Sequence, residues 1–507
     1  MMDRAEYPPR FNMAHYCIGR AAAADPGKVA LTVVSDVAAP LAAAERRTYG
    51  ALDHAVRRIA AGLRAEGLVP SDRLLIRLPN GSDYALMFFG AIAAGIVPIA
   101  ASPQLTEEEA RFLLEDSGAA AVAGVAMAGP HRTIDGDTLR RIKAATPLPD
   151  YADTAADDPA FLVYTSGTSR QPKGVLHAQR SAWGRRPIYD DWYGITADDI
   201  VLHAGAFNWS FTLGAGLTDP WANGATAVLY NGPRDVTVWP KLIKATGATL
   251  FAAVPSLYRQ MLKYCDLRRT DLTTLRHGLA AGEALPPAVL AEWRKVTGLE
   301  IYEAFGMSEC STFISTKPGT PARPGSPGKP QTGRRIAILP ADGGATPLPA
   351  GETGLLGIHR SDPGLMLGYW RLPDEDRRTT RGDWFVGGDL ARFDADGYVW
   401  PAGRADDVMN AGGFRVSPTE VEAAISGHPA VADVAVAERA VRPDVKVIAA
   451  YVVARPGASA DADAILAFAA THLAPYKRPR QVIFVDALPR TANGKVRRRA
   501  LGAVEAA

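Results

Sequence analysis

Amphipathic helical segments alternate with short apolar segments along most of this 507-residue chain, and this alternation constrains the fold more than any other feature. Residues 49–66 carry apolar side chains at three- and four-residue spacing, which predicts an amphipathic helix. A short strand is predicted at 72–78, then a second helix that ends near Gly95, and a buried strand again at 249–255. Such alternation predicts an α/β fold with mostly parallel sheets.

A second, smaller unit is predicted after residues 401–407 (PAGRADD), where the composition changes. It holds two helical and two β-rich segments, namely 418–425, 463–472, 431–437 and 446–453. We therefore expect residues 1–405 to form a large N-terminal domain of several subdomains. Residues 406–507 should form a small, mobile α+β domain, with the boundary close to Asp406.

The charge balance argues against a nucleic-acid partner. Lysine and arginine total 56 and aspartate and glutamate total 54, so the net charge is only +2. A charge this small gives no general attraction to nucleic acid or to an anionic membrane. The three cysteines lie far apart without a CxxC pair, so neither a disulfide framework nor a four-cysteine zinc site is expected.

The apolar segments predict neither a secretory signal nor a membrane span. The first residues lack the apolar core that a signal peptide needs. The most apolar stretch, 87–101, is interrupted by glycine and proline and is shorter than the ~20 residues of a spanning helix. We expect a cytoplasmic protein that is a monomer or a homodimer.

Five prolines recur at every third position between Pro318 and Pro330. One interpretation is a polyproline II ligand for the aromatic groove of a partner. The interpretation we favour is an ordered surface loop that leads into a strand at 335–339 (RIAIL).

The strongest local motif is the segment 164–175 (YTSGTSRQPKGV), which follows a predicted strand. Glycine lets the backbone approach an anion closely, hydroxyl and N–H groups donate to phosphate oxygens, and Lys173 adds a positive charge. The segment is not a Walker A loop, because Gly174 rather than Ser or Thr follows the lysine. It predicts a phosphate-binding loop of another kind.

This loop resembles that of the adenylate-forming enzymes, which include acyl- and aryl-CoA ligases, peptide-synthetase adenylation domains and luciferases. Further segments match the motifs of this family in the same chain order: 280–284 (AAGEA), 302–309 (YEAFGMSE), 384–390 (WFVGGDL), 403–407 (GRADD), 412–422 (GGFRVSPTEVE) and 489–495 (PRTANGK). The resemblance extends from about residue 25 to 500. It implies a large N-terminal domain and a mobile C-terminal lid.

The resemblance implies that the enzyme joins a carboxylic acid to coenzyme A through an acyl-adenylate, releasing AMP and pyrophosphate. ATP, Mg²⁺ and coenzyme A are the implied cofactors and co-substrates. Lys495 is the implied catalytic cation between the carboxylate and the α-phosphate, Glu309 the Mg²⁺ ligand, and Thr165 a catalytic residue of the loop. Charge placed where anions meet stabilises the transition state.

The family motifs also imply a nucleotide site. The implied ATP- and AMP-binding residues are Thr165, Ser166, Gly167, Thr168, Ser169, Lys173, Gly282, Glu283, Ala284, Glu303, Ala304, Phe305, Gly306, Ser308, Asp389, Arg404 and Arg415. Among them, Phe305 is expected to stack on adenine, and Asp389 and Arg404 to hold the ribose.

The lid is implied to present two faces in turn, by rotation about Asp406. The coenzyme A face is predicted to contain Gly412, Gly413, Phe414, Lys477 and Arg478. Glycines allow a hairpin to border the narrow tunnel for pantetheine. A plain β-turn for the glycines and solvated charges for Lys477 and Arg478 are the structural alternatives.

The acyl pocket is assigned from neighbouring motif positions to Phe207, Asn208, Trp209, Ala280, Ala281 and Gly306. Gly306 stands where acetyl-specific relatives have a bulky tryptophan, so a larger acyl group is expected. Aromatic walls over small residues favour an aromatic or alicyclic monocarboxylate, benzoate-like, with a medium-chain or branched aliphatic acid as the alternative.

Two departures from the family pattern and two other enzyme classes bear on this interpretation. Arg170 replaces a usual glycine, which leaves the shape of the phosphate loop open, whereas Ser308 keeps the hydroxyl of the usual threonine. The segment 306–310 lacks the second glycine of a GxSxG elbow, and no HExxH spacing occurs, so neither a serine hydrolase nor a zinc enzyme is expected.

Two functions other than acid–CoA ligation stay open. One is an adenylating enzyme that loads a carrier protein, and the other is a nucleotide-binding sensor.

Overall fold

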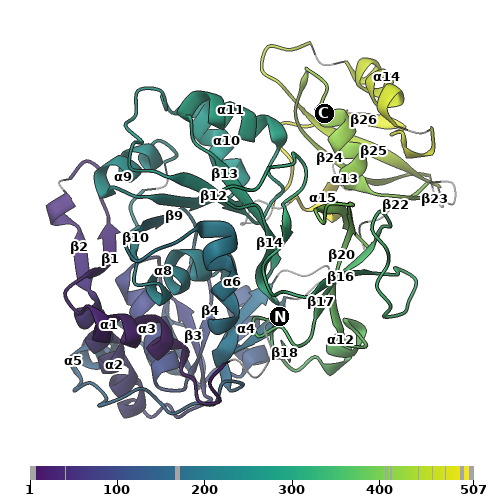
Figure 1. Cartoon of the computed structure of the whole chain (residues 1–507). Coiled ribbons are helices and arrows are strands. Elements are labelled where there is room, and N and C mark those ends of the chain that lie inside the picture. The colour runs from purple at the N-terminus through teal and green to yellow at the C-terminus, as the bar shows by residue number, and fades with distance from the viewer. Residues whose placement is uncertain are drawn as a thin grey trace. The chain divides into compact units, whose positions relative to one another are not determined.

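The computed structural model describes residues 7–39, 41–165, 172–233, 235–405, 407, 409–411, 414–442, 445–459, 461–473, 475–490 and 496–501. The chain divides into two compact units (Figure 1). The first comprises Met1–Arg335 and His359–Asp383, and the second Ile336–Ile358 and Trp384–Ala507.

A seven-stranded sheet of the first unit has the order β18-β8-β7-β4-β3-β5-β6. Its strands are β3 (Arg73–Arg77), β4 (Val97–Ala100), β5 (Ala121–Gly124), β6 (Arg132–Ile134), β7 (Pro159–Thr165), β8 (Lys173–Ala178) and β18 (Gly368–Tyr369). The pairs from β7 through β4, β3 and β5 to β6 are parallel, whereas β8 is antiparallel to both β7 and β18. The sheet is therefore mostly parallel, with antiparallel strands at one edge.

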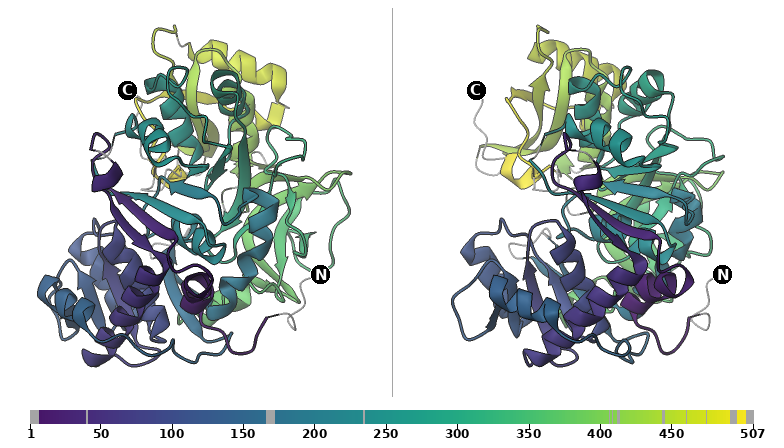
Figure 2. Two further views of the ribbon diagram at one scale, coloured as in Figure 1. Left: turned by 60° about the vertical axis from the view of Figure 1, so that its left-hand side comes forward. Right: turned by 90° about the vertical axis from the view of Figure 1, so that its left-hand side faces the viewer.

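Helices cover both faces of this sheet because successive side chains of a strand point to opposite sides. Leu74 and Ile76 of β3 belong to the cluster that includes the apolar side chains of α2 (Tyr49–Ala65) and α3 (Ser82–Ala93). Leu75 between them packs in the cluster of α4 (Glu107–Ser117) instead. α2 lies side by side with α3 and also with α5 (Gly136–Ala144) (Figure 1; further views in Figure 2).

A nine-stranded sheet has the order β15-β14-β13-β12-β11-β9-β10-β1-β2. Its strands are β1 (Val29–Val34), β2 (Glu45–Thr48), β9 (Ile200–His203), β10 (Thr226–Tyr230), β11 (Leu250–Ala253), β12 (His277–Ala281), β13 (Ile301–Met307), β14 (Ser311–Ser315) and β15 (Lys329–Pro330). The six central strands pair in parallel, and the outer pairs are antiparallel.

The helices of this region complete the first unit. They are η2 (His15–Gly19), α1 (Arg20–Ala24), η5 (Trp183–Arg185), α6 (Arg186–Ile188), η6 (Tyr189–Tyr193), α7 (Ser210–Leu213), η7 (Gly214–Thr218), α8 (Asp219–Ala222), α9 (Val238–Thr246), α10 (Pro255–Tyr264), α11 (Pro287–Thr297) and α12 (Pro373–Arg378). The short turns η3 (Leu41–Ala43) and η4 (Gln179–Ser181) and the strand β19 (Thr380–Arg381) also belong here.

The second unit contains mostly antiparallel sheets. One includes β16 (Ile336–Leu339), β17 (Gly354–His359), β20 (Trp384–Phe393) and β21 (Val399–Arg404). The others are formed by β22 (Met409–Ala411) with β23 (Phe414–Val416), and by β24 (Val431–Arg442), β25 (Val445–Ala454) and β26 (Gln481–Phe484). The helices are α13 (Pro418–Ser426), α14 (Ala462–His472), the turn η8 (Pro475–Lys477) and α15 (Arg498–Leu501).

The predicted α/β class and the predicted elements at 49–66, 72–78 and 249–255 are confirmed. The proline-containing segment leads into β16, as the loop interpretation predicts. In the structure, β16, β17, β20 and β21 belong to the same compact unit as the last hundred residues. The sequence predicted a boundary at Asp406 instead, and Asp406 lies outside the described residues. That boundary stays a prediction.

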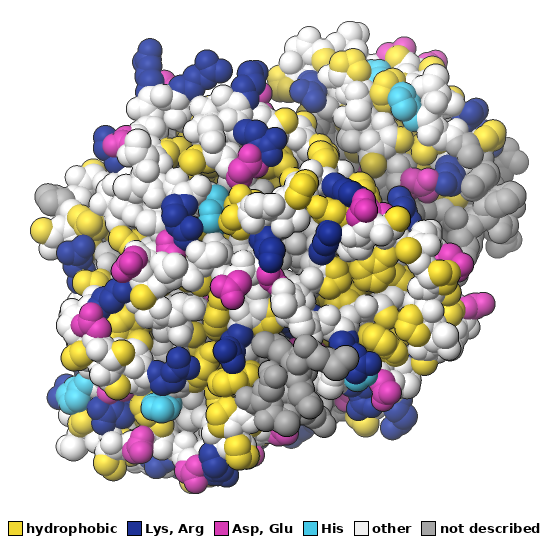
Figure 3. Space-filling model, in the orientation of Figure 1, with side chains coloured by type: hydrophobic (Ala, Val, Ile, Leu, Met, Phe, Trp, Pro, Cys, Tyr) yellow, Lys and Arg dark blue, Asp and Glu magenta, His cyan; other side chains and the backbone are white. Residues whose placement is uncertain are grey.

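Charges of both signs are interspersed over the described part of the face in Figure 3, in keeping with the small net charge. Within the described ranges, no helix combines the length and apolar character needed to cross a membrane.

Candidate active site

The ends of β7 and β8 hold the two described termini of the predicted phosphate loop. Thr165 pairs with Lys173 in the antiparallel register, and its hydroxyl lies 3.5 Å from the Lys173 carbonyl. The intervening Ser166, Gly167, Thr168, Ser169 and Arg170 lie outside the described residues. The strand pairing nevertheless places Lys173 at the mouth of this loop.

Lys173 is held by a carboxylate that the sequence did not indicate. Its Nζ forms an ion pair with Glu375 of α12, and both side chains are mostly buried, at 14% and 15% exposed. The same Nζ lies 5.5 Å from the centre of the Tyr369 ring. The cation is therefore oriented before any phosphate arrives.

Tyr369 also contacts Glu309, the predicted metal ligand. Its hydroxyl donates to Glu309 Oε1 at 2.7 Å, and the N–H of Met366 donates to the Glu309 carbonyl at 2.7 Å. β18 carries Tyr369 to this position by pairing Tyr369 with Val175 of β8. The structure thus brings together Lys173 and Glu309, which lie far apart in the sequence.

Sequence reasoning missed Tyr369 and Glu375 because neither belongs to a segment with a chemical signature of its own. The short strand GY and the acidic start of α12 give no local signal of proximity to the phosphate loop. Burial and the contact with Glu309 raise the pKa of Tyr369, so the hydroxyl stays a hydrogen-bond donor.

The predicted adenine-pocket segments lie side by side, because β12 and β13 pair in parallel. Ala280 is opposite Glu303, and Ala281 is opposite Ala304. Gly282, at the end of β12, has φ of +91°, and a Cβ there would lie 2.5 Å from the Trp209 ring. Glycine is required by both its backbone conformation and this close approach.

Glu303 is buried next to this pocket and accepts a hydrogen bond from the Leu285 N–H at 2.9 Å. Burial raises the pKa of its carboxyl to about 7. Glu283 accepts a hydrogen bond from the Ser256 hydroxyl at 3.2 Å, and Ala284 is exposed. Two of the predicted nucleotide-binding residues therefore have defined protein partners.

Gly306 has a reason to be glycine that the sequence did not indicate. A Cβ at this position would lie 2.3 Å from the Ser311 carbonyl oxygen and 2.6 Å from the Thr312 Cα, both backbone atoms of the antiparallel β14. The close approach of β14 is sufficient to require glycine, whereas the sequence argument took it as room for the acyl group. That room stays a prediction. Phe305 packs edge-on against Phe313, with ring centres 5.7 Å apart.

The predicted acyl-pocket residues do not share one environment. Phe207 is 1% exposed and packs on Tyr84 in the core, with ring centres 5.1 Å apart. Asn208 and Trp209 are half-buried, and the Trp209 ring meets Phe211 edge-on at 5.2 Å. Ala280 and Ala281 are buried on β12. Phe207 is therefore a core residue, whereas the Trp209 ring lies close to Gly282.

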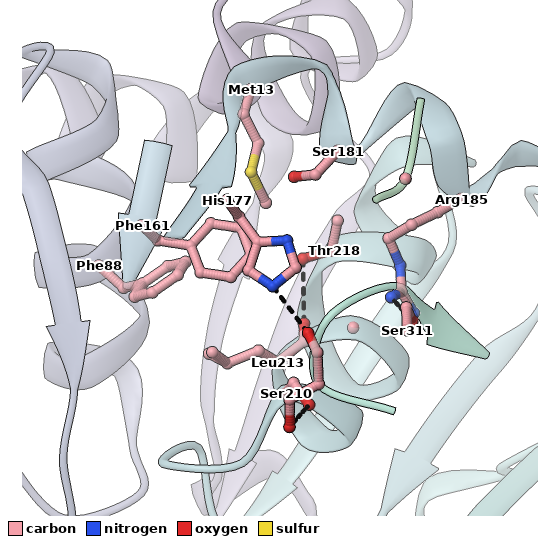
Figure 4. A pocket seen from close by; sticks show the side chains of 13 residues that line it. Met13, Phe88, Phe161, His177, Ser181, Arg185, Ser210, Leu213, Thr218 and Ser311 are labelled. Atoms are coloured by element: carbon pink, nitrogen blue, oxygen red, sulfur yellow. Dashed lines mark hydrogen bonds between the residues drawn. The ribbon is translucent and has the colours of Figure 1, made fainter. Parts of the chain in front are cut away.

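A cavity of about 30 Å³ lies in the first unit beside Ser308 (Figure 4). Ser210 and Ser308 lie at its edge, with hydroxyl oxygens 3.4 Å apart. His177 of β8 projects into it, and its other lining residues are Met13, Phe88, Phe161, Ser181, Arg185, Leu213, Gly214, Thr218, Ser311 and Gly364. Apart from Ser308, none of these residues was predicted from the sequence.

Arg185 enters this cavity with its charge balanced. Its Nε and Nη2 donate to the two carboxylate oxygens of Asp219, each at 2.6 Å, and Nη1 donates to the Ser311 hydroxyl. Tyr193 donates to the same carboxylate at 2.8 Å. The guanidinium therefore forms a bidentate ion pair with Asp219, which balances its charge.

The predicted ribose-binding pair lies in the second unit. Asp389 of β20 is opposite Arg404 of β21, and Arg404 Nη1 lies 3.4 Å from both carboxylate oxygens. The sequence predicted that these two residues serve the same sugar, and the strand register places them together.

The predicted lid residues are only partly described. Asp406, Gly412, Gly413 and Lys495 lie outside the described residues. Phe414 and Arg415 lie on β23, paired with Ala411 and Asn410. Lys477 forms an ion pair with Glu420. The Arg478 guanidinium donates to the carbonyls of Leu473 and Ala470 at 2.9 and 2.8 Å, at the end of α14.

Among the residues that the structure describes, no group of three or more His, Cys, Asp and Glu side chains is arranged to hold a metal ion. Burial lowers the pKa of His203 to about 3 and that of His277 to about 4, so both are neutral core residues.

Two family models match the chain. The AMP-binding enzyme model matches residues 18–370, and the AMP-binding enzyme C-terminal domain model matches residues 420–495. The chain belongs to the AMP-binding enzyme family.

Comparison with individual proteins gives the same family. The chain is 34% identical to the benzoate–CoA ligase of Thauera aromatica, covering 97% of this chain and 95% of that protein. It is 31% identical to human mitochondrial acyl-coenzyme A synthetase ACSM5, covering 87% of this chain and 80% of that protein. Among solved structures, it is similar to a benzoate CoA ligase from Burkholderia xenovorans LB400, with a TM-score of 0.85, 30% identity and 97% and 99% of the two chains covered. It is also similar to the anthranilate CoA ligase AuaEII in complex with anthranoyl-AMP, with a TM-score of 0.87, 28% identity and 99% and 98% covered.

Proposed function

We propose that the protein is an AMP-forming acid–CoA ligase that activates a benzoate-like monocarboxylic acid. The observation that carries this proposal is the meeting of Lys173, from the predicted phosphate loop, and Glu309, from a separate family motif, at Tyr369. The similarity to benzoate–CoA and anthranilate CoA ligases supports the same class of reaction.

The chemistry requires cations between anions. A carboxylate is a poor electrophile, so the acid attacks the α-phosphorus of ATP, forms an acyl-adenylate and releases pyrophosphate. Lys173 is held at the phosphate end of the site by Glu375, and Lys495 of the lid is assigned to the carboxylate and the α-phosphate. Removal of one such preorganised group costs about 10²–10³ in rate.

Glu309 suits a Mg²⁺ ion that arrives with the nucleotide. Mg²⁺ is commonly held by one or two carboxylates together with substrate phosphates and water. Tyr369 donates to Oε1 of Glu309 and so orients the carboxylate, and among the described residues no hydrogen bond occupies Oε2, which can face the ion. When bound, the ion supplies positive charge to the phosphates.

The acid is proposed to have one carboxylate and a compact, largely apolar body. Trp209 lies over Gly282 at the end of β12, beside buried Ala281, which suits a flat ring. Arg185 is buried nearby, but its charge is balanced by Asp219 and is not offered to a second carboxylate. A medium-chain or branched aliphatic acid stays the alternative.

In the second half-reaction, the coenzyme A thiol attacks the acyl-adenylate and displaces AMP. We assign the pantetheine tunnel to the hairpin that contains Gly412 and Gly413. Lys477 is a candidate for the coenzyme A phosphates, provided that it leaves Glu420. The Arg478 guanidinium already donates hydrogen bonds to carbonyls at the end of α14. These bonds favour a structural role at the helix end over binding of the coenzyme A phosphates.

Acid-dependent ATP–pyrophosphate exchange tests the proposal. The purified protein is assayed with benzoates, cyclohexane carboxylates and C4–C10 fatty acids, with and without free coenzyme A. We expect exchange with benzoates without coenzyme A, and net AMP release with it. Lys495→Ala should lose exchange by about 10²-fold or more. Exchange without any AMP release on coenzyme A addition would favour a carrier-protein-loading enzyme, and absence of exchange would contradict adenylation.

A further inference from the structure

Glu375 places a negative charge beside the cation that the proposed function assigns to phosphate. Among the described residues, it is the carboxylate that forms an ion pair with Lys173, and the two side chains are 15% and 14% exposed. The pair joins the start of β8 to α12. Charges interact more strongly where water is partly excluded, so this carboxylate acts on any phosphate that Lys173 binds.

Glu375 is ionised at neutral pH. Lys173 Nζ donates to its Oε1, and Arg378 Nη2 donates to both carboxylate oxygens at 2.6 Å. Burial raises the pKa of this carboxyl, but the hydrogen bonds and positive charges of Arg378 and Lys173 outweigh burial, so the pKa lies below its ordinary value. The negative charge next to Lys173 is therefore permanent at working pH.

The Lys173 ammonium needs a counter-ion whenever phosphate does not provide one, because a mostly buried cation without a partner is costly. The Tyr369 ring, whose centre lies 5.5 Å from Nζ, adds only the weaker attraction of an aromatic face. Glu309 accepts from the Tyr369 hydroxyl and is assigned to Mg²⁺. Glu375 therefore balances the charge of Lys173 between one catalytic cycle and the next.

Pyrophosphate and Glu375 can contact Lys173 at the same time. An ammonium has three N–H donors, and Glu375 uses one of them. A phosphate oxygen that accepts from another donor then lies close to the carboxylate. Two negative charges ~4 Å apart weaken binding by a factor of about five even at the dielectric constant of water. The carboxylate that stabilises Lys173 thus also weakens its hold on phosphate.

We propose that Glu375 is a counter-ion that limits the retention of pyrophosphate at Lys173, so that pyrophosphate leaves once the acyl-adenylate has formed. The inference rests on the proposed ligase function and extends it to product release. The alternative role is that of an anchor, which only holds the ammonium in place. The two roles predict opposite signs, because loss of an anchor weakens pyrophosphate binding and loss of an opposing charge tightens it.

The test measures the inhibition constant of pyrophosphate for Glu375→Gln and for the wild type. The initial rate of AMP release is followed at rising pyrophosphate concentration, with the most active acid of the exchange panel and free coenzyme A. The glutamine carbonyl still accepts a hydrogen bond from Lys173, so the substitution removes the charge and keeps the contact. We expect the inhibition constant to fall by about 5–30-fold.

Two further variants separate this effect from other consequences of the substitution. Asp374→Asn removes a neighbouring charge of α12 whose side chain is 89% exposed and paired with Arg377, and it should leave the inhibition constant unchanged. The double variant Glu375→Gln, Arg378→Gln removes one charge of each sign. Tighter pyrophosphate binding that persists in it comes from Lys173 rather than from the Arg378 side chain, which is 69% exposed.

The double variant also decides the question if Glu375→Gln folds poorly, because it leaves neither charge of the Glu375–Arg378 pair behind. An unchanged or higher inhibition constant in folded Glu375→Gln would overturn the inference, as would tightening that disappears in the double variant. Acid-dependent exchange by the wild type would still support the proposed function in both cases. Absence of that exchange in the wild type would contradict the proposed function itself.

Discussion

At the scale of single residues, Tyr369 orients Glu309 through one hydrogen bond of 2.7 Å. Tyr369→Phe should lower the rate of adenylation and raise the Mg²⁺ concentration for half-maximal rate, by about 10–100-fold, because residues that orient a metal ligand contribute at that level. Pyrophosphate release measured against Mg²⁺ concentration checks this. Tyr264→Phe, at a tyrosine that is 57% exposed, is the control. An unchanged Mg²⁺ requirement in Tyr369→Phe would contradict the assignment.

Glu303 predicts a pH dependence of stability. Burial raises the pKa of its carboxyl to about 7, against an ordinary value of 4.5. Between these values the folded protein keeps a proton that the unfolded chain releases, so this residue lowers the free energy of unfolding as pH rises from 4.5 to 7. Each unit of separation corresponds to about 1.4 kcal/mol.

Glu303→Gln should therefore gain stability over the wild type as pH rises from 5 to 7.5, as measured by urea unfolding at both values. Glu292→Gln, at a carboxylate whose side chain is 48% exposed, should show no such gain. A difference between Glu303→Gln and the wild type that is the same at both pH values would mean that the carboxyl ionises normally.

Residue identities in the site were predictable where a motif has its own chemistry, and not elsewhere. Lys173 was identified because a lysine beside glycines and hydroxyls is informative in the sequence alone, whereas Glu309 was identified through the resemblance of residues 302–309 to a family motif. Tyr369, Glu375 and His177 matter because of which side chains they meet. That information arises from strand pairing between distant segments.

At the scale of elements, the buried pair of Arg185 and Asp219 joins η5 to the start of α8, with the Asp219 side chain fully buried. Asp219→Asn should cost about 3–5 kcal/mol in the free energy of unfolding, because it leaves a buried guanidinium uncompensated. Urea unfolding at pH 7 checks this. The exposed pair of Arg269 and Asp266 is the control, and Asp266→Asn should cost under about 1 kcal/mol. Equal losses of unfolding free energy in Asp219→Asn and Asp266→Asn would show that burial does not determine the cost of breaking the ion pair.

Element types were largely predictable, whereas their neighbours were not. Periodicity predicted α2, β3 and α13 within a few residues. It contained no sign that β14 would approach Gly306 closely enough to exclude a Cβ, or that β18 would pair with β8. Periodicity reports which face of an element is apolar, but not which partner covers that face.

At the scale of the whole molecule, the last hundred residues have a hydrophobic core of their own. One cluster includes Met409, Val421, Ile425 and Val452, and another includes Tyr451 and Leu501. A fragment of residues 406–507 should therefore unfold cooperatively in urea, as followed by circular dichroism. A fragment of residues 430–507, which lacks α13 and so Val421 and Ile425, should show no cooperative transition. Non-cooperative behaviour of the longer fragment would place the boundary elsewhere.

By itself the sequence determined the α/β class, most elements and a phosphate-binding loop, because these depend on short-range patterns of polarity, charge and backbone freedom. The chemistry of adenylation was implied by the resemblance of several sequence motifs to one enzyme family. Only the tertiary structure decided that Tyr369 would contact both Lys173 and Glu309. It also decided that β14 would approach Gly306 too closely for a Cβ, and that His177 and Ser181 would line the same cavity. Those outcomes depend on which distant strands pair and in what register, and local sequence patterns do not specify that.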